Sequence, residues 1–299
     1  MIVRDMIHEI AWAGNGARVA LGLFEQPVEI WDPGAREQVS TFSTILDLGG
    51  KRLALSSDGT ILVAASYHRD GVAAYDAVRG VPIWQRQDVK KVQHMSASRR
   101  NALIYLAREL GPGLVLDIRT GETVAQRRGV KAIWESAYGP LMIDGVKPGV
   151  FNFDVSNIDV FTRRFVVERS SFAILACAFS ADALAVAEAA GAVQCICLRT
   201  AKPLWRAELT RGMHCLALGY SKSLNTFVGV LWSYQSGGSK LLVHFDVDGT
   251  NRTIAILGQP TATCFDPDAA HLLTSDRLVF SVLTGQCSPL QADAPTAVR

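Results

Sequence analysis

A pattern of short apolar segments separated by polar turns recurs along this chain of 299 residues. Its clearest copy has four apolar runs of strand length, at 53–55, 61–66, 72–75 and 83–84. Asp58-Gly59 separates the first two runs, and this dipeptide favours a tight hairpin because both residues tolerate positive φ. The second run is almost continuously apolar, which is typical of a strand covered on both faces. Four antiparallel strands in about forty residues indicate one blade of a β-propeller.

The third strand of this unit and the turn after it recur seven times. The copies align on a large apolar residue near the end of each third strand: Trp31, Tyr75, Leu116, Phe161, Ile196, Phe245 and Phe280. The intervals between these residues are 44, 41, 45, 35, 49 and 35, which average about forty, the spacing of propeller blades. The sequence therefore predicts an all-β fold, a seven-bladed β-propeller of four-stranded antiparallel blades.

A turn between first and second strands supports the same division. It recurs as Asn15-Gly16, Asp58-Gly59, Arg100-Asn101, Asp182-Ala183 and Asp268-Ala269. The fourth repeat has Tyr138-Gly139-Pro140 in its place, and the sixth has Lys222-Ser223-Leu224-Asn225. The fourth repeat is expected to span 130–170 and to contain a long loop from Asp144 to Asn157, because this segment carries Gly, Pro and Asn.

Three segments share one turn signature: Ser56-Ser57-Asp58-Gly59, Phe179-Ser180-Ala181-Asp182 and Phe265-Asp266-Pro267-Asp268. The pairs Trp31-Asp32 and Tyr75-Asp76 close two of the third strands. In these features the chain resembles the WD-repeat family of β-propellers, over roughly residues 2 to 291. It departs from the family's pattern in one respect, since the Gly-His pair that often opens a family repeat is missing from every copy. Sugar-lactonase-like and quinoprotein-like propellers share the same blade pattern.

The repeats are expected to form a single domain, residues 1–291, followed by a disordered tail at 292–299. Ile2-Val3 are expected to supply the outer strand of the last blade, which would join the two ends of the chain without an open sheet edge. No apolar run reaches the roughly 18 residues of a transmembrane helix, and charged residues interrupt the N-terminal segment, unlike a secretory signal. We therefore expect a cytoplasmic protein with no membrane insertion.

Cysteines and charges also bear on the class of protein. Six cysteines lie mostly in strand-like segments: Cys177, Cys195, Cys197, Cys215, Cys264 and Cys287. They are expected to be small buried hydrophobes in a reducing cytosol, and His214-Cys215 is an isolated near-match to a zinc-ligand pair. The net charge is +2. Three basic pairs fall in different repeats and are expected at solvated edges: Arg99-Arg100, Arg127-Arg128 and Arg163-Arg164. Because they form no stripe that would follow phosphates, no nucleic-acid partner is expected.

The sequence contains no Gly-x-Ser-x-Gly elbow, phosphate loop or His-Glu-x-x-His motif. Gly14-Asn15-Gly16 is interpreted as a hairpin turn, since no helix pattern follows it. The alternative function is a metal-dependent lactonase-like or hydrolase-like enzyme with a site in the central channel, as in related propellers. Glu135, Asp144 and Asn152 are candidates for such a site, although the preferred interpretation is that they are ordinary polar loop residues. The sequence thus assigns no catalytic residue, no cofactor and no metal ligand.

Recognition of another protein is the remaining function. In a propeller, the loops between second and third strands and those that enter first strands share one rim around the channel. Aromatic and arginine side chains dominate the energetics of interfaces, and these loops are predicted to carry Phe24, Glu25, His68, Arg69, Arg108, Glu109, Trp134, Glu135, Tyr234 and Gln235. Four other tryptophans are expected to pack within or between blades: Trp12, Trp31, Trp84 and Trp205.

We therefore predict a non-catalytic propeller that binds an unidentified protein through this rim, as a scaffold, adaptor or inhibitor (an immunity-type partner). A third hypothesis is the sensing of a small ligand in the channel.

Overall fold

The computed structural model of this chain describes residues 6–23, 26–44, 51–66, 71–136, 139–144, 150–154, 157–165, 174–233 and 237–291. Within these ranges, 28 strands form seven four-stranded antiparallel sheets, which we number 1 to 7 in chain order. In each sheet, strands that follow one another in the chain are also neighbours in space.

Sheets 1 to 4 contain β1 (Ile7–Trp12), β2 (Val19–Leu23), β3 (Val28–Asp32), β4 (Glu37–Phe42); β5 (Lys51–Leu55), β6 (Ile61–Ser66), β7 (Val72–Asp76), β8 (Pro82–Arg86); β9 (Val92–Ala97), β10 (Leu103–Arg108), β11 (Gly113–Asp117), β12 (Thr123–Arg127); β13 (Val130–Ser136), β14 (Gly139–Asp144), β15 (Val150–Asp154) and β16 (Asn157–Phe165). Sheets 5 to 7 contain β17 (Ile174–Phe179), β18 (Ala183–Glu188), β19 (Ala192–Cys197), β20 (Pro203–Glu208); β21 (Met213–Ser221), β22 (Thr226–Ser233), β23 (Lys240–Phe245), β24 (Asn251–Gly258); β25 (Thr263–Phe265), β26 (His271–Thr274), β27 (Leu278–Ser281) and β28 (Cys287–Pro289).

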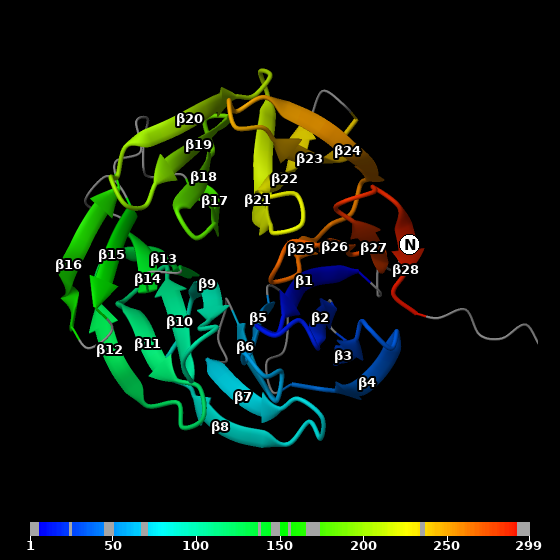
Figure 1. Ribbon diagram of the computed structural model, residues 1–299. Helices are drawn as coiled ribbons and strands as arrows, with labels where there is room; N and C mark the ends of the chain where they lie inside the picture. Colours follow the sequence, from blue (N-terminus) through cyan, green and yellow to red (C-terminus); the bar gives the residue numbers. More distant parts are fainter. Residues whose placement is uncertain are drawn as a thin grey trace, which may run out of the picture.

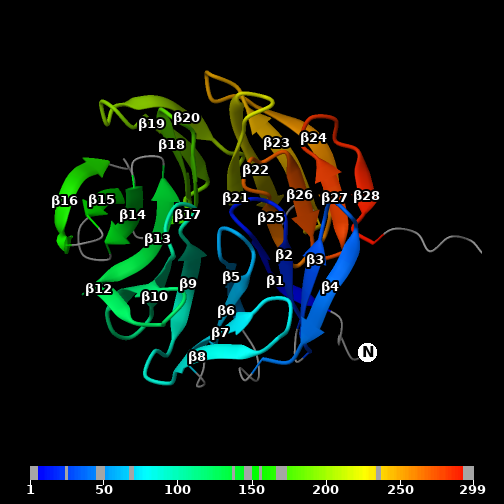
Figure 2. The ribbon, with the colours of Figure 1, turned by 60° about the horizontal axis from the view of Figure 1, so that its bottom comes forward.

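The sheets stand side by side around a central axis (Figure 1). The first strand of each sheet is innermost and the fourth lies at the circumference, as Figure 1 and the tilted view in Figure 2 both show. The prediction of an all-β propeller built from four-stranded antiparallel blades is therefore confirmed.

Sheet 2 shows why the repeat folds in this way. Alternate side chains of a strand point to opposite faces, and in β6 both faces are covered. Leu62 and Ala64 enter a core shared with sheet 1, whereas Val63 and Ala65 enter a core shared with sheet 3. The almost continuous apolar run at 61–66 is thus explained by a strand that lies between two neighbouring sheets.

The turn that follows β7 fixes the outer strand. The Asp76 carboxylate accepts hydrogen bonds of 2.9 Å from two backbone N–H groups of its own turn, and Gly80 N donates to the Asp76 carbonyl at 2.8 Å. Gly80 has a φ of +68°, and an added Cβ there would lie 2.6 Å from the Phe42 side chain. Asp32 and Asp117 make the same turn in sheets 1 and 3, which explains the Asp that closes these third strands.

Sheet 4 departs from the predicted boundaries. Its third strand is β15, which lies inside the segment predicted to be a long loop. Phe161 belongs to the outer strand β16 and pairs with Phe153 of β15. With Phe153 in place of Phe161, the intervals to Leu116 and Ile196 become 37 and 43 residues, so the repeat is more regular than the sequence alignment indicated.

The ends of the chain meet between sheets 7 and 1. The outer strand of sheet 7 is β28, from the C-terminal part of the chain, so the prediction that Ile2-Val3 fill this position is wrong. β1 lies beside β25 in both ribbon views, and Thr261 Oγ1 donates to the Ile7 carbonyl at 2.7 Å. Residues 1–5 and the predicted tail at 292–299 lie outside the described residues.

The six cysteines are all free thiols. Cys195 and Cys215 are fully buried, as predicted, whereas Cys287 is exposed on β28. In the part of the chain that the structure describes, no helix has the length and apolarity needed to cross a bilayer.

Candidate functional site

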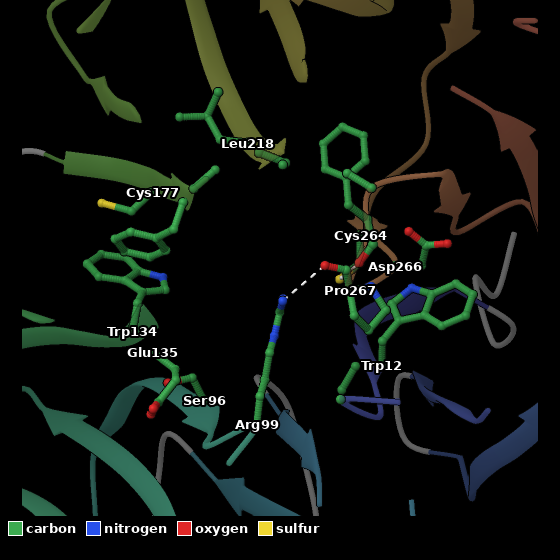
Figure 3. Close-up of a pocket in the computed structure, with 18 of the residues that line it drawn as sticks. Trp12, Ser96, Arg99, Trp134, Glu135, Cys177, Leu218, Cys264, Asp266 and Pro267 are labelled. Atoms are coloured by element: carbon green, nitrogen blue, oxygen red, sulfur yellow. Dashed lines mark hydrogen bonds between the residues drawn. The ribbon is translucent and has the colours of Figure 1, made fainter. Parts of the chain in front are cut away.

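The first strands of the seven sheets line a cavity of about 790 Å³ along the central axis. The lining residues of each first strand include those nearest its turn into the second strand. Figure 3 shows residues of several sheets facing one another across this space, among them Trp134, Cys177 and Trp12. We call this cavity the channel.

Three successive sheets carry ionisable residues at equivalent positions of their first strands, and two of these residues, Glu9 and His94, line the channel. In sheets 1, 2 and 3 the turn after the first strand is closed by a hydrogen bond from the backbone N–H of Ala13, Ser56 or Ser98. Four residues before these donors lie Glu9, Arg52 and His94, which therefore occupy equivalent positions. Arg52 Nη1 lies 3.0 Å from Glu9 Oε2. Burial raises the pKa of Glu9, and the pairing with Arg52 opposes this shift.

His94 is electrically neutral at physiological pH. Burial and then the nearby positive charge of Arg52 lower its pKa to about 4. Its ring packs edge-on against Trp134, with centroids 4.7 Å apart, and its Nδ1 is enclosed without a hydrogen-bond partner in the described structure. The imidazole therefore serves as part of an aromatic wall.

Trp134 and Glu135 lie in β13 and not in a rim loop, which corrects their predicted position. Both line the channel (Figure 3). Glu135 Oε2 accepts a hydrogen bond of 2.7 Å from the buried Tyr105 hydroxyl of sheet 3. Burial, then the Glu135 charge, raise the pKa of Tyr105. Trp134 packs against the core between sheets 4 and 5.

Arg108 and Glu109 do lie where β10 enters its loop to β11, as predicted. Glu109 is exposed, and its backbone N–H donates to the Lys91 carbonyl at 2.9 Å. The Arg108 guanidinium lies against Gly111, whose φ is +105°, and burial lowers the pKa of Arg108. Leu110, which sequence reasoning did not single out, is 67% exposed at the tip of this loop. The other predicted rim residues lie outside the described residues: Phe24, Glu25, His68, Arg69, Tyr234 and Gln235.

The four tryptophans predicted to pack within strands are all placed in strands. Trp31 is 2% exposed and donates to Glu29 at 2.8 Å. Trp84 of sheet 2 donates to the Ile118 carbonyl of sheet 3 at 2.9 Å. Trp205 stacks on Phe245 across the boundary of sheets 5 and 6. Trp12 differs, because it also lines the channel and its Nε1 is enclosed without a hydrogen-bond partner in the described structure.

Arg99 spans one end of the channel. It lies in the β9–β10 turn, and its Nη1 donates to the Pro267 carbonyl of the β25–β26 turn at 3.0 Å (Figure 3). This basic pair was expected at a solvated edge; Arg99 is exposed, but its side chain is directed over the channel. Arg99 directly follows Ser98, whose hydroxyl accepts from two backbone N–H groups of this turn. That position is the one sequence signal that could have located Arg99.

The residues considered for an enzymatic metal site lie on three strands of sheet 4: Glu135 on β13, Asp144 on β14 and Asn152 on β15. Among the residues that the structure describes, no group of three or more His, Cys, Asp or Glu is arranged to hold a metal ion. Cys177 and Cys264 also line the channel. Burial raises the pKa of both thiols, that of Cys264 to about 12, so both are protonated at neutral pH.

The fold and the inner-strand channel define a β-propeller with the architecture of WD40-repeat proteins. Among solved structures, the WD40 repeats of RRP9 superpose with a TM-score of 0.69 and 13% identity, over 90% of this chain and 86% of that one. U3-55K gives a TM-score of 0.68 and 13% identity, over 90% and 88%. The computationally designed Ika8 protein gives 0.63 and 17%, over 97% and 89%. At these identities the likeness concerns the fold alone. No protein-family model matches the sequence, and no curated protein matches it.

Proposed function

We propose that this chain is a non-catalytic, protein-binding propeller in which the seven sheets act as the blades of one closed ring. The observation that carries the proposal is the loop between β10 and β11. It presents Leu110, 67% exposed, beside the charged residues Arg108 and Glu109. A large apolar side chain flanked by charges at the tip of an ordered loop is the kind of anchor that a protein partner can cover.

The scaffold around this loop favours recognition because it holds the loop still. The Glu109 backbone is bonded to Lys91 in the connection that enters sheet 3, and Lys91 Nζ also lies 3.9 Å from the Glu109 carboxylate. Arg108 Nη1 approaches the Asp88 carbonyl at 3.5 Å. An anchor held in place before binding loses less conformational entropy when the partner docks.

A scaffold, adaptor or inhibitory partner of another protein is consistent with this rim. The resemblance to WD40 propellers supports the proposal at the level of fold. We also infer a reducing, cytoplasmic location, since the six cysteines are unpaired.

The test is affinity purification of the tagged chain from its own host, followed by quantitative mass spectrometry. We expect one partner in fixed ratio to the bait, and we expect Leu110→Arg to reduce its recovery at least about tenfold, as for the loss of an interface anchor. Leu204→Arg is the matched control, because Leu204 is also a leucine, 57% exposed, but lies on the outer strand β20. Equal recovery with both variants would contradict the proposal.

A further inference from the structure

The channel has a cationic group at one end that no carboxylate neutralises. The Arg99 guanidinium extends across this end and bonds the neutral Pro267 carbonyl. Within the described residues, Arg99 forms no ion pair. A guanidinium carries five N–H donors, and the bond to Pro267 occupies only one of them, so this group has donors left for a ligand.

The position of Arg99 is fixed by the turns around it. The Arg99 carbonyl accepts a bond of 2.9 Å from Ser57 Oγ of sheet 2, and the Ser57 carbonyl accepts one of 2.9 Å from Asn15 N of sheet 1. On the opposite side, the turn that carries Pro267 is joined to sheet 6, because Lys222 Nζ lies 2.7 Å from Asp268 Oδ1. Arg99 thus bridges two groups of turns that are each braced, and its guanidinium is held in place before any ligand arrives.

The acidic side chains along the channel have partners of their own. Glu135 accepts from the Tyr105 hydroxyl, and Glu9 is paired with Arg52. Asp266 accepts from Ala270 N at 2.8 Å and lies 3.0 Å from His271 Nδ1. Because none of these carboxylates pairs with Arg99, an incoming anion would find the guanidinium unneutralised.

The walls on either side of Arg99 are aromatic. Trp134 and Trp12 lie to its two sides in Figure 3, and other rings line the same cavity: His94, Phe179, Tyr220 and Phe265. The volume of about 790 Å³ lies within the roughly 300–1,000 Å³ of small-molecule sites. Arg100 and Lys222 also line the cavity, and Lys222 is paired with Asp268. Aromatic walls with a cationic end suit a flat apolar body that carries a negative group.

We propose that the channel binds a carboxylate or phosphate group carried on an aromatic body, and that Arg99 receives the anion. The ligand replaces or joins the Pro267 carbonyl as acceptor, while its body packs between the aromatic walls. The anionic group can belong to a free small molecule or to a side chain of the protein partner. This inference concerns the channel and does not depend on the rim contact at Leu110.

The experiment is calorimetric titration of the full chain with 2-naphthoate, and with 2-naphthamide as its uncharged counterpart. We expect 2-naphthoate to bind, and Arg99→Gln to weaken it about tenfold or more, since a hydrogen bond to a charged group contributes about 1.5–3 kcal/mol. Arg99→Lys retains the charge and should recover part of the affinity. The amide should bind the wild type about tenfold more weakly than 2-naphthoate, and Arg99→Gln should not change its affinity further.

Arg119→Gln is the matched control, because it removes an exposed arginine from the β11–β12 turn, away from the channel lining. The proposal is overturned if 2-naphthoate binds Arg99→Gln as tightly as wild type, if Arg119→Gln weakens binding equally, or if no binding is measured up to about 10 mM. The affinity purification of the partner, repeated with Arg99→Gln, then identifies the source of the anionic group. Recovery that falls with Arg99→Gln assigns the anion to the partner, and unchanged recovery assigns it to a free ligand. Leu110→Arg should leave the titration unaltered, which separates this test from that of the rim.

Discussion

The boundary between sheets 5 and 6 and the boundary between sheets 7 and 1 join neighbouring sheets by different means. At the first, Trp205 of β20 lies parallel to Phe245 of β23, with ring centroids 5.8 Å apart and an interplanar angle of 20°. Phe227 meets the same indole edge-on at 6.3 Å. Buried alanines and Cys195 and Cys215 complete this core. This core is apolar and depends on shape, and the contact of 3.1 Å between His214 Nδ1 and the Ala189 carbonyl also crosses the boundary.

The second boundary closes the ring. It has an apolar core of its own, which includes Leu21, Trp31 and Leu273, and directed polar bonds are added to this core. Arg277 Nη2 of sheet 7 lies 2.9 Å from Glu29 Oε1 of sheet 1. Glu29 Oε2 also accepts from Trp31 Nε1 at 2.8 Å, and the Arg277 guanidinium lies 5.8 Å from the Trp31 ring centroid. A groove of about 490 Å³ also lies between sheets 7 and 1, lined in part by Pro33, Arg36 and Pro289. Within the described residues, sheets 7 and 1 exchange no strand.

The difference shows two ways of fixing one sheet against the next. Sheets 5 and 6 are adjacent in the chain, so apolar packing needs only to fill the space between them. Sheets 7 and 1 come from opposite ends of the chain, and bonds between particular atoms supplement their apolar core, which supplies direction that apolar contact lacks.

The largest effect should come from the apolar boundary. Phe245→Ala removes a fully buried ring and the stack on Trp205, and we expect a loss of about 3–5 kcal/mol in the free energy of unfolding. Leu273→Ala is the corresponding change at the boundary of sheets 7 and 1, where this fully buried side chain packs in one core with Leu21 and Trp31. Chemical denaturation should give a smaller loss for Leu273→Ala, because no ring stack is removed. Equal losses would remove the distinction between the two boundaries.

The second effect tests the polar closure. Glu29→Ala leaves Arg277 and the Trp31 indole N–H without their shared acceptor, and we expect a loss of about 2 kcal/mol. The double variant with Arg277→Ala should lose less than the sum of the two single variants, because both remove the same contact. Strict additivity in denaturation experiments would mean that the pair does not couple.

A smaller effect is expected where the segment before β25 contacts the first residue of β1. Thr261→Val keeps the side-chain shape and removes the bond from Oγ1 to the Ile7 carbonyl. We expect a loss of about 1 kcal/mol, measured by denaturant unfolding. Thr210→Val, an exposed change outside this boundary, is the control and should have little effect. A loss for Thr261→Val no larger than that of the control would show that this bond does not hold the boundary.

Much of this architecture could be predicted because its turns are local. Gly59, with a φ of +73°, and the Asp76 turn mark strand ends through the conformations that only a few residue types adopt. The third strand of sheet 4 was missed for the same reason. Val150–Asp154 follows Pro148-Gly149, which resembles a loop, and the neighbouring outer strand fits the repeat pattern nearly as well.

The channel could not be predicted from local patterns. The bond from Arg99 to Pro267 joins residues 168 positions apart, and it exists only because the ring closes. Trp134 and Glu135 were assigned to a rim loop because the degenerate turn of sheet 4 left the end of β13 undefined. Sequence spacing indicates which strand is innermost, but which residues of that strand reach the axis depends on the register between sheets.

The smallest expected effect is a pH dependence of stability at His271, which lines the groove between sheets 7 and 1. The hydrogen bond with the Asp266 carboxylate raises the pKa of His271 above its ordinary value near 6.5. The resulting stability is fully present below the unfolded pKa and is lost as the pH rises through the folded pKa. His271→Gln should therefore lower the Tm more at pH 5.5 than at pH 8.5. In an Asp266→Asn background, His271→Gln should change the Tm by the same amount at both pH values. A larger effect at pH 8.5 would show that His271 is held as the neutral imidazole and forms no charged pair with Asp266.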